Sequence, residues 1–349
     1  MIDIDGSWGE GGGQILRTSL ALSALLQKPV RIFNIRKGRK VPGLKPQHFM
    51  GVKILGDFCN AEIKGLRIGS TEIEFVPKGF ILTDKQIDIG TAGSISLLLQ
   101  ILTPLLIFSS KEITLTIKGG TSGLGAPNIE YLKYVTFPLI SKLGIKKPEI
   151  EVIKQGYYPK GQGLVKVKFY GIRKINSINL TDRGKVLKVR GVSVVGSLPA
   201  DVCKRQKEGA ESFLKSSGIE DVEIETVVTR TASPGTSITL WAECKNSLLG
   251  ADDRGEKGVR AEVIGRRCAE KLLNSIKSGA ALDKFMADQI LVFLALAESF
   301  SEITVEKITN HCLTNIWVIE KILGIKFEVS GKKDSLGKLK VKGIGFTHS

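Results

Sequence analysis

The order of predicted helices and strands recurs three times along this sequence. Each recurrence begins with an apolar helix and continues with a strand, a second helix and two further strands. The first group comprises a helix over 9–26, a strand over 30–35, a helix over 46–58 and strands over 61–63 and 72–76. The second comprises a helix over 92–102, a strand over 112–117, a helix over 127–144 and strands over 149–153 and 164–169. The third comprises a helix over 287–297, a strand over 303–308, a helix over 309–323 that carries His311, and strands over 326–329 and 338–341.

This recurrence predicts an α/β fold of three repeated units, each with a sheet and a pair of helices. The first helices of the three groups also share a glutamine followed by two apolar residues, at 14–16, 100–102 and 289–291. One such unit cannot cover its own sheet, so we expect the three to pack through their helices, with the apolar first helices at the centre. A coincidence of ordinary α/β patterning is the alternative.

Residues 184–279 interrupt this pattern within the third unit. They contain a strand over 187–195, a helix over 200–216, strands over 222–225 and 237–241, and a helix over 259–276. This set of elements is sufficient for a small inserted α/β domain. We therefore predict two domains, a core formed by 1–183 together with 280–349 and an insert formed by 184–279.

Basic residues outnumber acidic ones, with 51 Lys and Arg against 35 Asp and Glu, which gives a net charge of +16. Such an excess favours a polyanionic partner, a nucleic acid or a nucleotide, although a solvated basic surface would explain it as well. Hydrophobic residues make up 42% of the chain and charged residues 25%, which is typical of a globular protein with a sizeable core.

The five cysteines are scattered and form no CxxC pair, which argues against a zinc ribbon or a thioredoxin-like site. Reduced thiols fit a cytoplasmic protein best. The longest apolar run, 97–108, is interrupted by Gln100, Thr103 and Pro104 and is too short to span a bilayer. Residues 1–5 are acidic and do not resemble a signal peptide. We therefore expect a cytoplasmic location and no membrane partner.

His311 falls at the turn between a predicted strand and a predicted helix. The helix dipole opposes a positive charge at that end, so the imidazole is biased toward its neutral, nucleophilic form. Free amides of the first helical turn also attract anions such as phosphate. A neutral imidazole beside a phosphate site can act as a nucleophile on phosphorus, although a polar residue in a turn is the simpler interpretation of a lone histidine.

If the units are true repeats, the loops after their middle strands occupy equivalent positions. In the first unit this loop, 36–48, is rich in Lys and Arg and has two glycines, as expected of a flexible loop that binds phosphate. In the second unit the loop 118–127 is glycine-rich, and in the third it carries His311. The three loops would then face a common centre, whereas the basic loop alone fits a solvated charge run equally well.

A second glycine-rich segment, 9–14, opens the first helix, and Arg17 follows one turn later. Its glycines allow a phosphate or a neighbouring repeat to approach closely, and Glu10 could bind Mg²⁺ or Mn²⁺. A tight turn for helix packing is the alternative. The sequence contains no Walker A, HExxH or GxSxG motif, so P-loop, zincin and α/β-hydrolase chemistry are unsupported.

Several short motifs occur together in this chain. They are Gly-Glu-Gly-Gly-Gly-Gln-Ile-Leu-Arg at 9–17, the segments 35–39, 42–44 and 47–48, the segment 90–94 with Gln100, the segments 119–121, 126–127 and 287–289, and His-Cys-Leu-Thr-Asn-Ile at 311–316. In combination they resemble the RNA 3′-terminal phosphate cyclase family, and the similarity extends over almost the whole chain, insert included. The resemblance implies a core of three α/β units with a small inserted domain.

The same resemblance implies a ligase activity, the ATP-dependent conversion of an RNA 3′-terminal phosphate to a 2′,3′-cyclic phosphate. The histidine of the third unit would attack the α-phosphate of ATP and release pyrophosphate. The histidine–AMP intermediate would donate adenylate to the RNA 3′-phosphate, and the neighbouring 2′-hydroxyl would then displace AMP. RNA and ATP are therefore the expected partners.

The family's site residues carry over to matching positions of this sequence. The implied catalytic residues are His311, Glu10, Arg17 and Arg39, with Glu10 also as the ligand of a divalent metal, Mg²⁺ or Mn²⁺. The implied nucleotide-binding residues are Arg36 and Gln47 at the phosphates, Gln100, Met286, Ala287, Asp288 and Gln289 along the nucleotide, and Pro127, Tyr131 and Phe285 around adenine. Some family members carry Tyr in place of Phe285, so only ring stacking is expected there.

Two other functions stay open. A nonenzymatic relative that binds RNA in ribosome assembly would share the fold, but such relatives lack the histidine that His311 matches. An enolpyruvyl transferase would share the repeated α/β architecture, yet its two near-equal domains do not fit one small insert. The sequence leaves open the natural RNA, the choice between ATP and GTP, the role of the insert and whether the chain forms a homo-oligomer.

Overall fold

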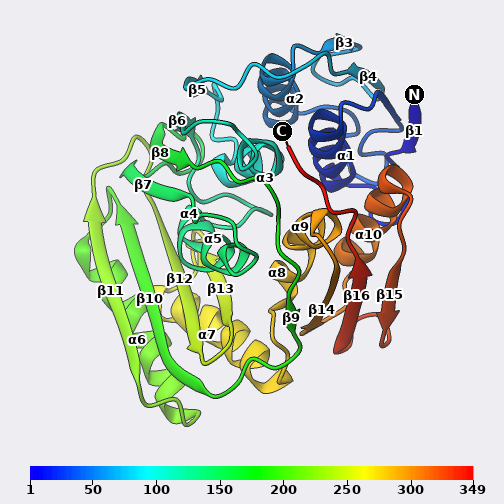
Figure 1. Cartoon of the computed structure of the whole chain (residues 1–349). Helices are drawn as coiled ribbons and strands as arrows, with labels where there is room; N and C mark the ends of the chain where they lie inside the picture. Colours follow the sequence, from blue (N-terminus) through cyan, green and yellow to red (C-terminus); the bar gives the residue numbers. More distant parts are fainter. Residues whose placement is uncertain (349) are drawn as a thin grey trace.

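The structure is a computed structural model that describes residues 1–348, and these residues form four four-stranded sheets with helices packed against them (Figure 1). The first sheet has the order β1 (Ile2–Asp5), β2 (Val30–Phe33), β4 (Ile73–Val76), β3 (Glu62–Lys64). The second has the order β5 (Lys85–Asp88), β6 (Ile113–Gly119), β8 (Gly163–Phe169), β7 (Glu149–Lys154). The third has the order β9 (Asn179–Leu180), β14 (Phe300–Val305), β16 (Gly337–Lys342), β15 (Phe327–Ser330).

These three sheets also share one pattern of strand directions. In each, the first edge strand is parallel to its neighbour, whereas the other two pairings are antiparallel. The short parallel strands β1, β5 and β9 were absent from the sequence prediction. They have only two to four residues, too few for a period-two pattern to be recognised without the partner strand.

The helices form the interior between these sheets. The first pair is α1 (Gly13–Leu26) and α2 (Pro46–Phe58), followed by α3 (Ile95–Leu106) and a helical run of α4 (Ile129–Tyr131), η1 (Leu132–Thr136) and α5 (Phe137–Ser141). The last group is α8 (Lys284–Gln289), α9 (Leu291–Leu296) and α10 (Asn310–Leu323). Helix α1 packs against α2, α3 and α10 and is buried along almost its whole length, which explains its high apolar content.

Most predicted helices are present, with one correction. The predicted helix over 46–58 has the same bounds as α2. The helical run predicted over 127–144 spans Ile129–Ser141 and contains a π turn in its middle. The single helix predicted over 287–297 is wrong, because the chain forms two short helices, α8 and α9, that meet at Ile290. The apolar run itself could not reveal the break, since it continues without interruption from Ile290 to Ala297, all of them buried.

The fourth sheet is built from the interrupting segment. Its order is β11 (Val222–Thr229), β10 (Val186–Gly196), β12 (Gly235–Cys244), β13 (Leu248–Arg254), and the helices α6 (Ala200–Ser216) and α7 (Ala261–Ser278) pack on one face. A separate apolar core lies between this sheet and the two helices. On the other face Trp241 stacks on Tyr134 of η1, with ring centroids 4.4 Å apart, and joins the main core. The domain boundaries at 184 and 279 stay a prediction.

Among residues 1–348, no helix combines the length and the apolarity needed to cross a membrane.

The closest contact between α6 and α7 lies at Gly265. A Cβ atom added there would overlap with the backbone carbonyl of Gln206, which cannot rotate away. We therefore predict that Gly265→Ala lowers the free energy of unfolding by about 1–3 kcal/mol, the usual cost of overpacking. Thermal and urea unfolding would measure the loss. Gly123→Ala is the matched control, because a Cβ at Gly123 would meet nothing within 4 Å, and an equal loss in both variants would contradict the prediction.

Candidate active site

The amino end of α10 presents His311 in its first turn. The N-cap hydroxyl of Thr309 accepts a hydrogen bond from the Cys312 amide at 3.1 Å, which fixes where the helix begins. One turn further, Asn315 accepts from the Thr18 hydroxyl of α1 at 2.5 Å and donates to the Asp288 carbonyl of α8 at 2.6 Å. Helices α1, α8 and α10 are therefore joined by polar contacts directly behind His311.

The imidazole of His311 is held from both ring nitrogens. Nδ1 contacts Oε1 of Gln14, and Gln14 Nε2 donates to Oδ2 of Asp288 at 2.9 Å. Because the Gln14 amide nitrogen donates to the carboxylate, its oxygen must accept, and Nδ1 therefore carries a proton. In the neutral ring this leaves the lone pair on Nε2. Oε2 of Glu10 lies 2.7 Å from that nitrogen, and because both atoms are then acceptors, a proton lies between them whenever this contact is made.

Charged groups surround that nitrogen. Arg39, from the loop after β2, pairs with the other oxygen of Glu10. Burial lowers the pKa of His311; Asp288 opposes this shift, while Arg17 and Arg39 add to it. The dipole of α10 acts in the same direction as burial. Burial also lowers the pKa of Arg17 to about 10, against the attraction of Asp288. These effects favour the neutral imidazole that a nucleophile needs, whereas the Glu10 carboxylate favours the protonated ring for as long as it contacts Nε2.

A cavity of about 550 Å³ opens beside His311. Its lining includes the polar and charged residues Arg17, Gln100, Asp288 and Gln289, and also Pro127, Tyr131 and Phe285. The Tyr131 and Phe285 rings meet edge to face with centroids 6.4 Å apart, and the Tyr131 hydroxyl donates to buried Asp283 at 2.7 Å. The cavity thus combines charged groups with aromatic rings, as suits a molecule with a phosphate chain and a flat ring.

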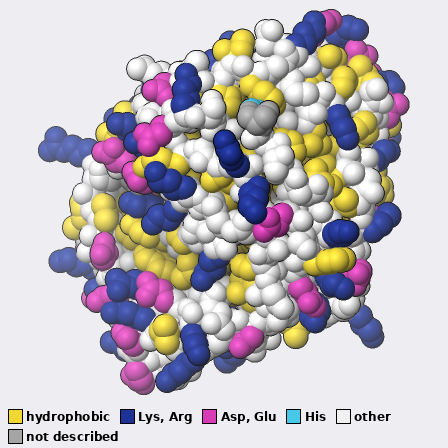
Figure 2. Space-filling view, in the orientation of Figure 1, with side chains coloured by type: hydrophobic (Ala, Val, Ile, Leu, Met, Phe, Trp, Pro, Cys, Tyr) yellow, Lys and Arg dark blue, Asp and Glu magenta, His cyan; other side chains and the backbone are white. Residues whose placement is uncertain are grey.

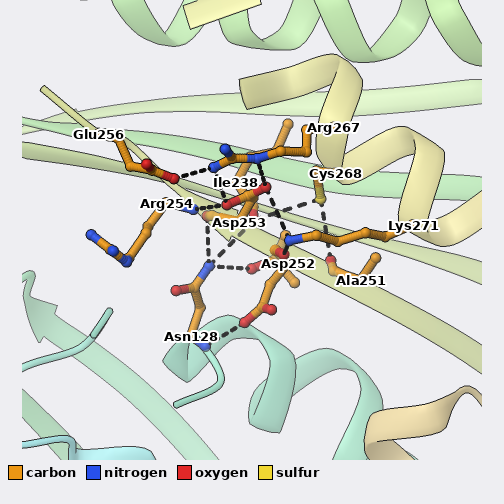
Figure 3. A network of polar contacts seen from close by, with 11 residues as sticks. Asn128, Ile238, Ala251, Asp252, Asp253, Arg254, Glu256, Arg267, Cys268 and Lys271 are labelled. Carbon is orange, nitrogen blue, oxygen red and sulfur yellow. Dashed lines mark hydrogen bonds and ion pairs between the residues drawn. The ribbon is translucent and has the colours of Figure 1, made fainter. Parts of the chain in front are cut away.

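The fourth sheet supplies one wall of this cavity (Figure 3). Asp253 accepts two hydrogen bonds from Arg267, at 2.6 and 2.9 Å, and one from Lys271 at 3.0 Å. Its neighbour Asp252 accepts from the backbone amide of Asn128 at 2.6 Å, and burial raises the pKa of Asp252 to about 6. This network ties β13 and α7 to the loop before α4, so the interrupting segment takes part in forming the site.

The structure brings ten of the predicted site residues to this region. They are Glu10, Arg17, Arg39, Gln100, Pro127, Tyr131, Phe285, Asp288, Gln289 and His311. The other four lie elsewhere. Met286 and Ala287 are fully buried in the core, Arg36 donates to the carbonyls of Val41 and Gly43, and Gln47 accepts from the Ser94 amide at 3.4 Å. Arg36 therefore braces the basic loop from inside rather than pointing outward.

Gln14 and Asn315 were not among the predicted site residues, although they fix the histidine. A signal was present in the sequence, because Gln14 and Thr18 are polar residues one turn apart in a helix rich in apolar residues. Buried polar side chains nearly always have hydrogen-bond partners, so such a pair indicates a contact with another helix. Which helix supplies the partner could not be read from the pattern.

The Glu10 carboxylate has the chemistry of a ligand for a divalent cation, although its two oxygens contact Arg39 and His311 here. Across residues 1–348 there is no group of three or more His, Cys, Asp or Glu side chains that could hold a metal ion. A cation here would take its remaining ligands from phosphate oxygens and water, which is the common arrangement for Mg²⁺ with nucleotides. The site thus fits a metal that arrives with a triphosphate.

The excess of positive charge does not by itself mark the site. Figure 2 shows Lys and Arg side chains spread over the visible face with Asp and Glu among them. The cationic groups that matter for the cavity are the few that line it, such as Arg17, Arg254 and Lys284.

Comparison with known proteins identifies close relatives. The model of a family described as RNA 3′-terminal phosphate cyclase matches residues 8–329. A protein of Ignicoccus hospitalis is 43% identical over 350 aligned positions, which cover 99% of each chain. One of Thermococcus kodakarensis is 44% identical over 340 positions, 97% of this chain and 98% of its own. One of Saccharolobus solfataricus is 41% identical over 345 positions, 98% of this chain and 100% of its own. All three are named RNA 3′-terminal phosphate cyclase.

A second histidine, His48 in α2, supports the start of α1. It is buried, and its Nδ1 accepts a hydrogen bond from the Lys45 amide at 3.3 Å. Burial, followed by the charges of Arg17, Arg36 and Lys45, lowers the pKa of His48 from 6.5 to about 3. Below pH 6.5 the unfolded chain therefore binds a proton at this histidine, whereas the folded chain does not. The contribution to the free energy of unfolding is complete above pH 6.5 and is lost as the pH falls toward 3.

We predict that His48→Asn makes stability less dependent on pH in this range, because asparagine keeps an acceptor but does not titrate. The melting temperature of the wild type should fall more steeply than that of the variant as the pH drops from 6.5 toward 4. Thermal unfolding across a pH series measures both slopes. Parallel slopes would show that His48 titrates normally in the folded protein.

Proposed function

The chain belongs to the RNA 3′-terminal phosphate cyclase family, and from this membership we propose that it converts the 3′-terminal phosphate of RNA to a 2′,3′-cyclic phosphate with ATP as co-substrate. The observation that carries the proposal is the state of His311. Its Nδ1 is bound to Gln14, its Nε2 is directed toward Glu10, and the cavity with Arg17 opens beside it. A nonenzymatic RNA-binding protein would have no need for this arrangement.

In the first step of the proposed reaction, Nε2 of His311 attacks the α-phosphorus of ATP. A nitrogen–phosphorus bond forms, the bond from the α-phosphorus to the bridging oxygen breaks, and pyrophosphate leaves. The Glu10 contact occupies Nε2 in this structure, so the phosphorus reaches it only after Glu10 turns away, and Arg39 is already bound to that carboxylate. Arg17 and Arg39 would stabilise the charge that develops on the departing pyrophosphate.

The ring gains positive charge as the new bond forms. Gln14 accepts a hydrogen bond from Nδ1–H and itself donates to Asp288, whose carboxyl pKa is raised by burial to about 6 and which therefore remains mostly ionised at pH 7. Asp288 thus offsets the developing charge through Gln14, without taking the proton. The same two residues hold the ring in one orientation, which is the entropic part of their contribution.

Two further displacements complete the reaction. An oxygen of the RNA 3′-phosphate attacks the adenylate phosphorus, the nitrogen–phosphorus bond breaks, and His311 is regenerated with an RNA–adenylate as product. The 2′-hydroxyl oxygen then attacks the terminal RNA phosphorus, its proton is lost, and AMP leaves with the bridging oxygen. A covalent intermediate divides one difficult condensation into steps with a good leaving group at each.

The cavity suggests how ATP is bound. Its size of about 550 Å³ lies in the range of nucleotide and drug-sized sites. Adenine would lie among Pro127, Tyr131 and Phe285, and the phosphates would extend past Gln100 to Arg17. Arg36, Gln47, Met286 and Ala287 do not line this cavity, so a role for them would be limited to supporting its walls.

A divalent metal would be held by Glu10 together with the phosphates. When bound, Mg²⁺ or Mn²⁺ would neutralise the triphosphate and polarise its oxygens. Glu10 also has a role within the protein, because its carboxylate contacts both Arg39 and His311 and keeps these side chains close to each other.

We propose that the three similar sheets are copies of one unit, as the sequence predicted. The support is their common strand order and their common pattern of directions. The insert of 184–279 would then lie between the first strand and first helix of the third copy. A cytoplasmic location is part of this proposal and is supported by five cysteines that are all buried and unpaired.

The first prediction from the proposed function concerns covalent labelling of His311. Purified protein incubated with ATP labelled at the α-phosphate and a divalent metal should become labelled, through a bond that acid breaks and base does not. His311→Ala should abolish the label, whereas His348→Ala, at the far end of the chain, should retain it. Gel autoradiography measures both. A label that survives in His311→Ala would place the nucleophile on another residue.

The second prediction concerns Gln14 as a positioning residue. Gln14→Ala frees the ring of His311, and we expect the rate of labelling to fall roughly 10- to 100-fold, the cost of losing a fixed orientation. Gln14→Glu places a negative charge beside Nδ1 and should raise the pKa of His311, which shifts the acidic limb of the pH–rate profile to higher pH. Exposed Gln86→Ala is the control. An unshifted profile in Gln14→Glu would reduce Gln14 to a structural role.

A further inference from the structure

We propose that Trp8 is a stacking platform for a base near the 3′ end of the RNA substrate. This assignment rests on the proposed function, because it names the surface on which the second substrate of His311 lies. The residues involved are outside the cavity assigned to the nucleotide.

One face of α10 carries a row of functional side chains. His311, Thr314, Trp317 and Lys321 are spaced three to four residues apart and so lie along one side of the helix. The segment 8–10 runs beside this row. Oε2 of Glu10 lies 2.7 Å from His311 Nε2, and the Glu10 amide donates to the Thr314 hydroxyl at 3.3 Å. The Trp8 ring stacks on Trp317, with centroids 4.7 Å apart and planes within 7°.

The position of Trp8 is fixed by its backbone. Its amide donates to the Asp5 carbonyl at 3.3 Å, and its own carbonyl accepts from the Gly11 amide at 2.9 Å. Gly9 has a φ of +56° and packs so closely on Thr314 that a side chain would not fit. The ring is therefore held in place before any ligand binds, which lowers the entropic cost of stacking.

The Trp8 ring remains available to a ligand. The ring is 38% exposed, although one of its faces is stacked on Trp317. A large aromatic side chain that is both rigid and open to solvent is a common platform for unpaired bases. Its distance from the reacting group is suitable too. Trp317, on which Trp8 stacks, lies six positions after His311 in α10, a rise of about 9 Å along the helix. This rise equals two to three stacked bases at roughly 3.4 Å each.

Two substrates must approach His311, and the structure offers two sides. The nucleotide cavity lies at the amino end of α10, where Thr309 and His311 both line it. The Trp8 platform lies further along the same helix, where the segment 8–10 packs on Thr314 and Trp317. The His311 side chain, 48% exposed, stands between the two regions. An RNA end that rests on Trp8 would therefore bring its phosphate to the histidine from outside the cavity assigned to adenine and Arg17.

Positive charges lie where the RNA backbone would run. Lys321 is exposed, and its ammonium group is 5.3 Å from the centroid of the Trp317 ring, at the far end of the row. At the near end the basic loop packs on the same turn, because Gly38 lies against Gly11. Lys37 and Arg39 flank that glycine, and Arg39 is 42% exposed. Aromatic stacking between basic groups is the usual design for single-stranded nucleic acid.

The test uses a short RNA that ends in a 3′-phosphate, and compares it with the same RNA carrying an abasic residue at each of its last three positions in turn. For wild-type protein, one abasic position should raise the KM for cyclisation roughly 5- to 100-fold, the usual effect of losing a base–aromatic stack. Trp8→Ala should raise the KM for the intact RNA by a similar factor. In this variant the RNA that is abasic at that position should have nearly the same KM as the intact RNA. Trp8→Phe should restore much of the loss.

Phe300→Ala provides the matched control, because Phe300 is 54% exposed and also has two lysines over its ring, Lys340 and Lys342. The platform is disproved if every abasic RNA keeps the wild-type KM, or if Trp8→Ala and the abasic change have additive effects. These outcomes differ from failure of the proposed function, in which the wild-type protein would not be labelled by ATP at all. The abasic series needs no substitution in the protein, so it can disprove the platform even if Trp8→Ala does not fold.

Discussion

The chain of hydrogen bonds from Asp288 through Gln14 to His311 is the contact on which the site depends. It joins α1 to α8 and α10, whose contacting residues lie 274 and 297 positions further along the chain. Because each member has one acceptable hydrogen-bonding role, the chain fixes the tautomer of the imidazole as well as its direction. A histidine on a loop would lack both constraints, whereas here the reactive nitrogen is positioned by the packing of the core.

The same packing explains why α10 cannot slide along α1. Thr18 and Asn315 are buried and satisfy each other, and Asn315 also binds the Asp288 carbonyl. A shift by one turn would leave these groups buried without partners, at a cost of about 1–3 kcal/mol for each. The apolar side chains of α1 supply most of the burial, but apolar contacts alone would allow several registers. The few polar contacts select one, and that register places His311 beside Glu10.

The interrupting segment contributes to the site although its core is separate. Asp252 and Asp253 on β13 reach the cavity wall, and Arg267 and Lys271 of α7 hold Asp253 there. Asn128, from the loop before α4, is bound to the same wall. Two bodies with their own apolar cores thus share one cavity, and a ligand held in it would touch both. On the other side of His311 the surface belongs to α10 and to the turn that carries Trp8.

The order of elements, the bounds of α2 and the helical location of His311 were accessible from the sequence, because hydrophobic periodicity is a local property of the chain. The motifs that resemble the family also supplied eight of the 22 residues that line the cavity. The break at Ile290, the strands β1, β5 and β9, and the inward role of Arg36 were not accessible, since each depends on a partner distant in sequence. The sequence by itself determined which side chains can do chemistry on phosphate. Only the tertiary structure decided which nitrogen of His311 can carry the reactive lone pair, because the proton on the other nitrogen is fixed by Gln14 and Asp288, which reach it from two other helices.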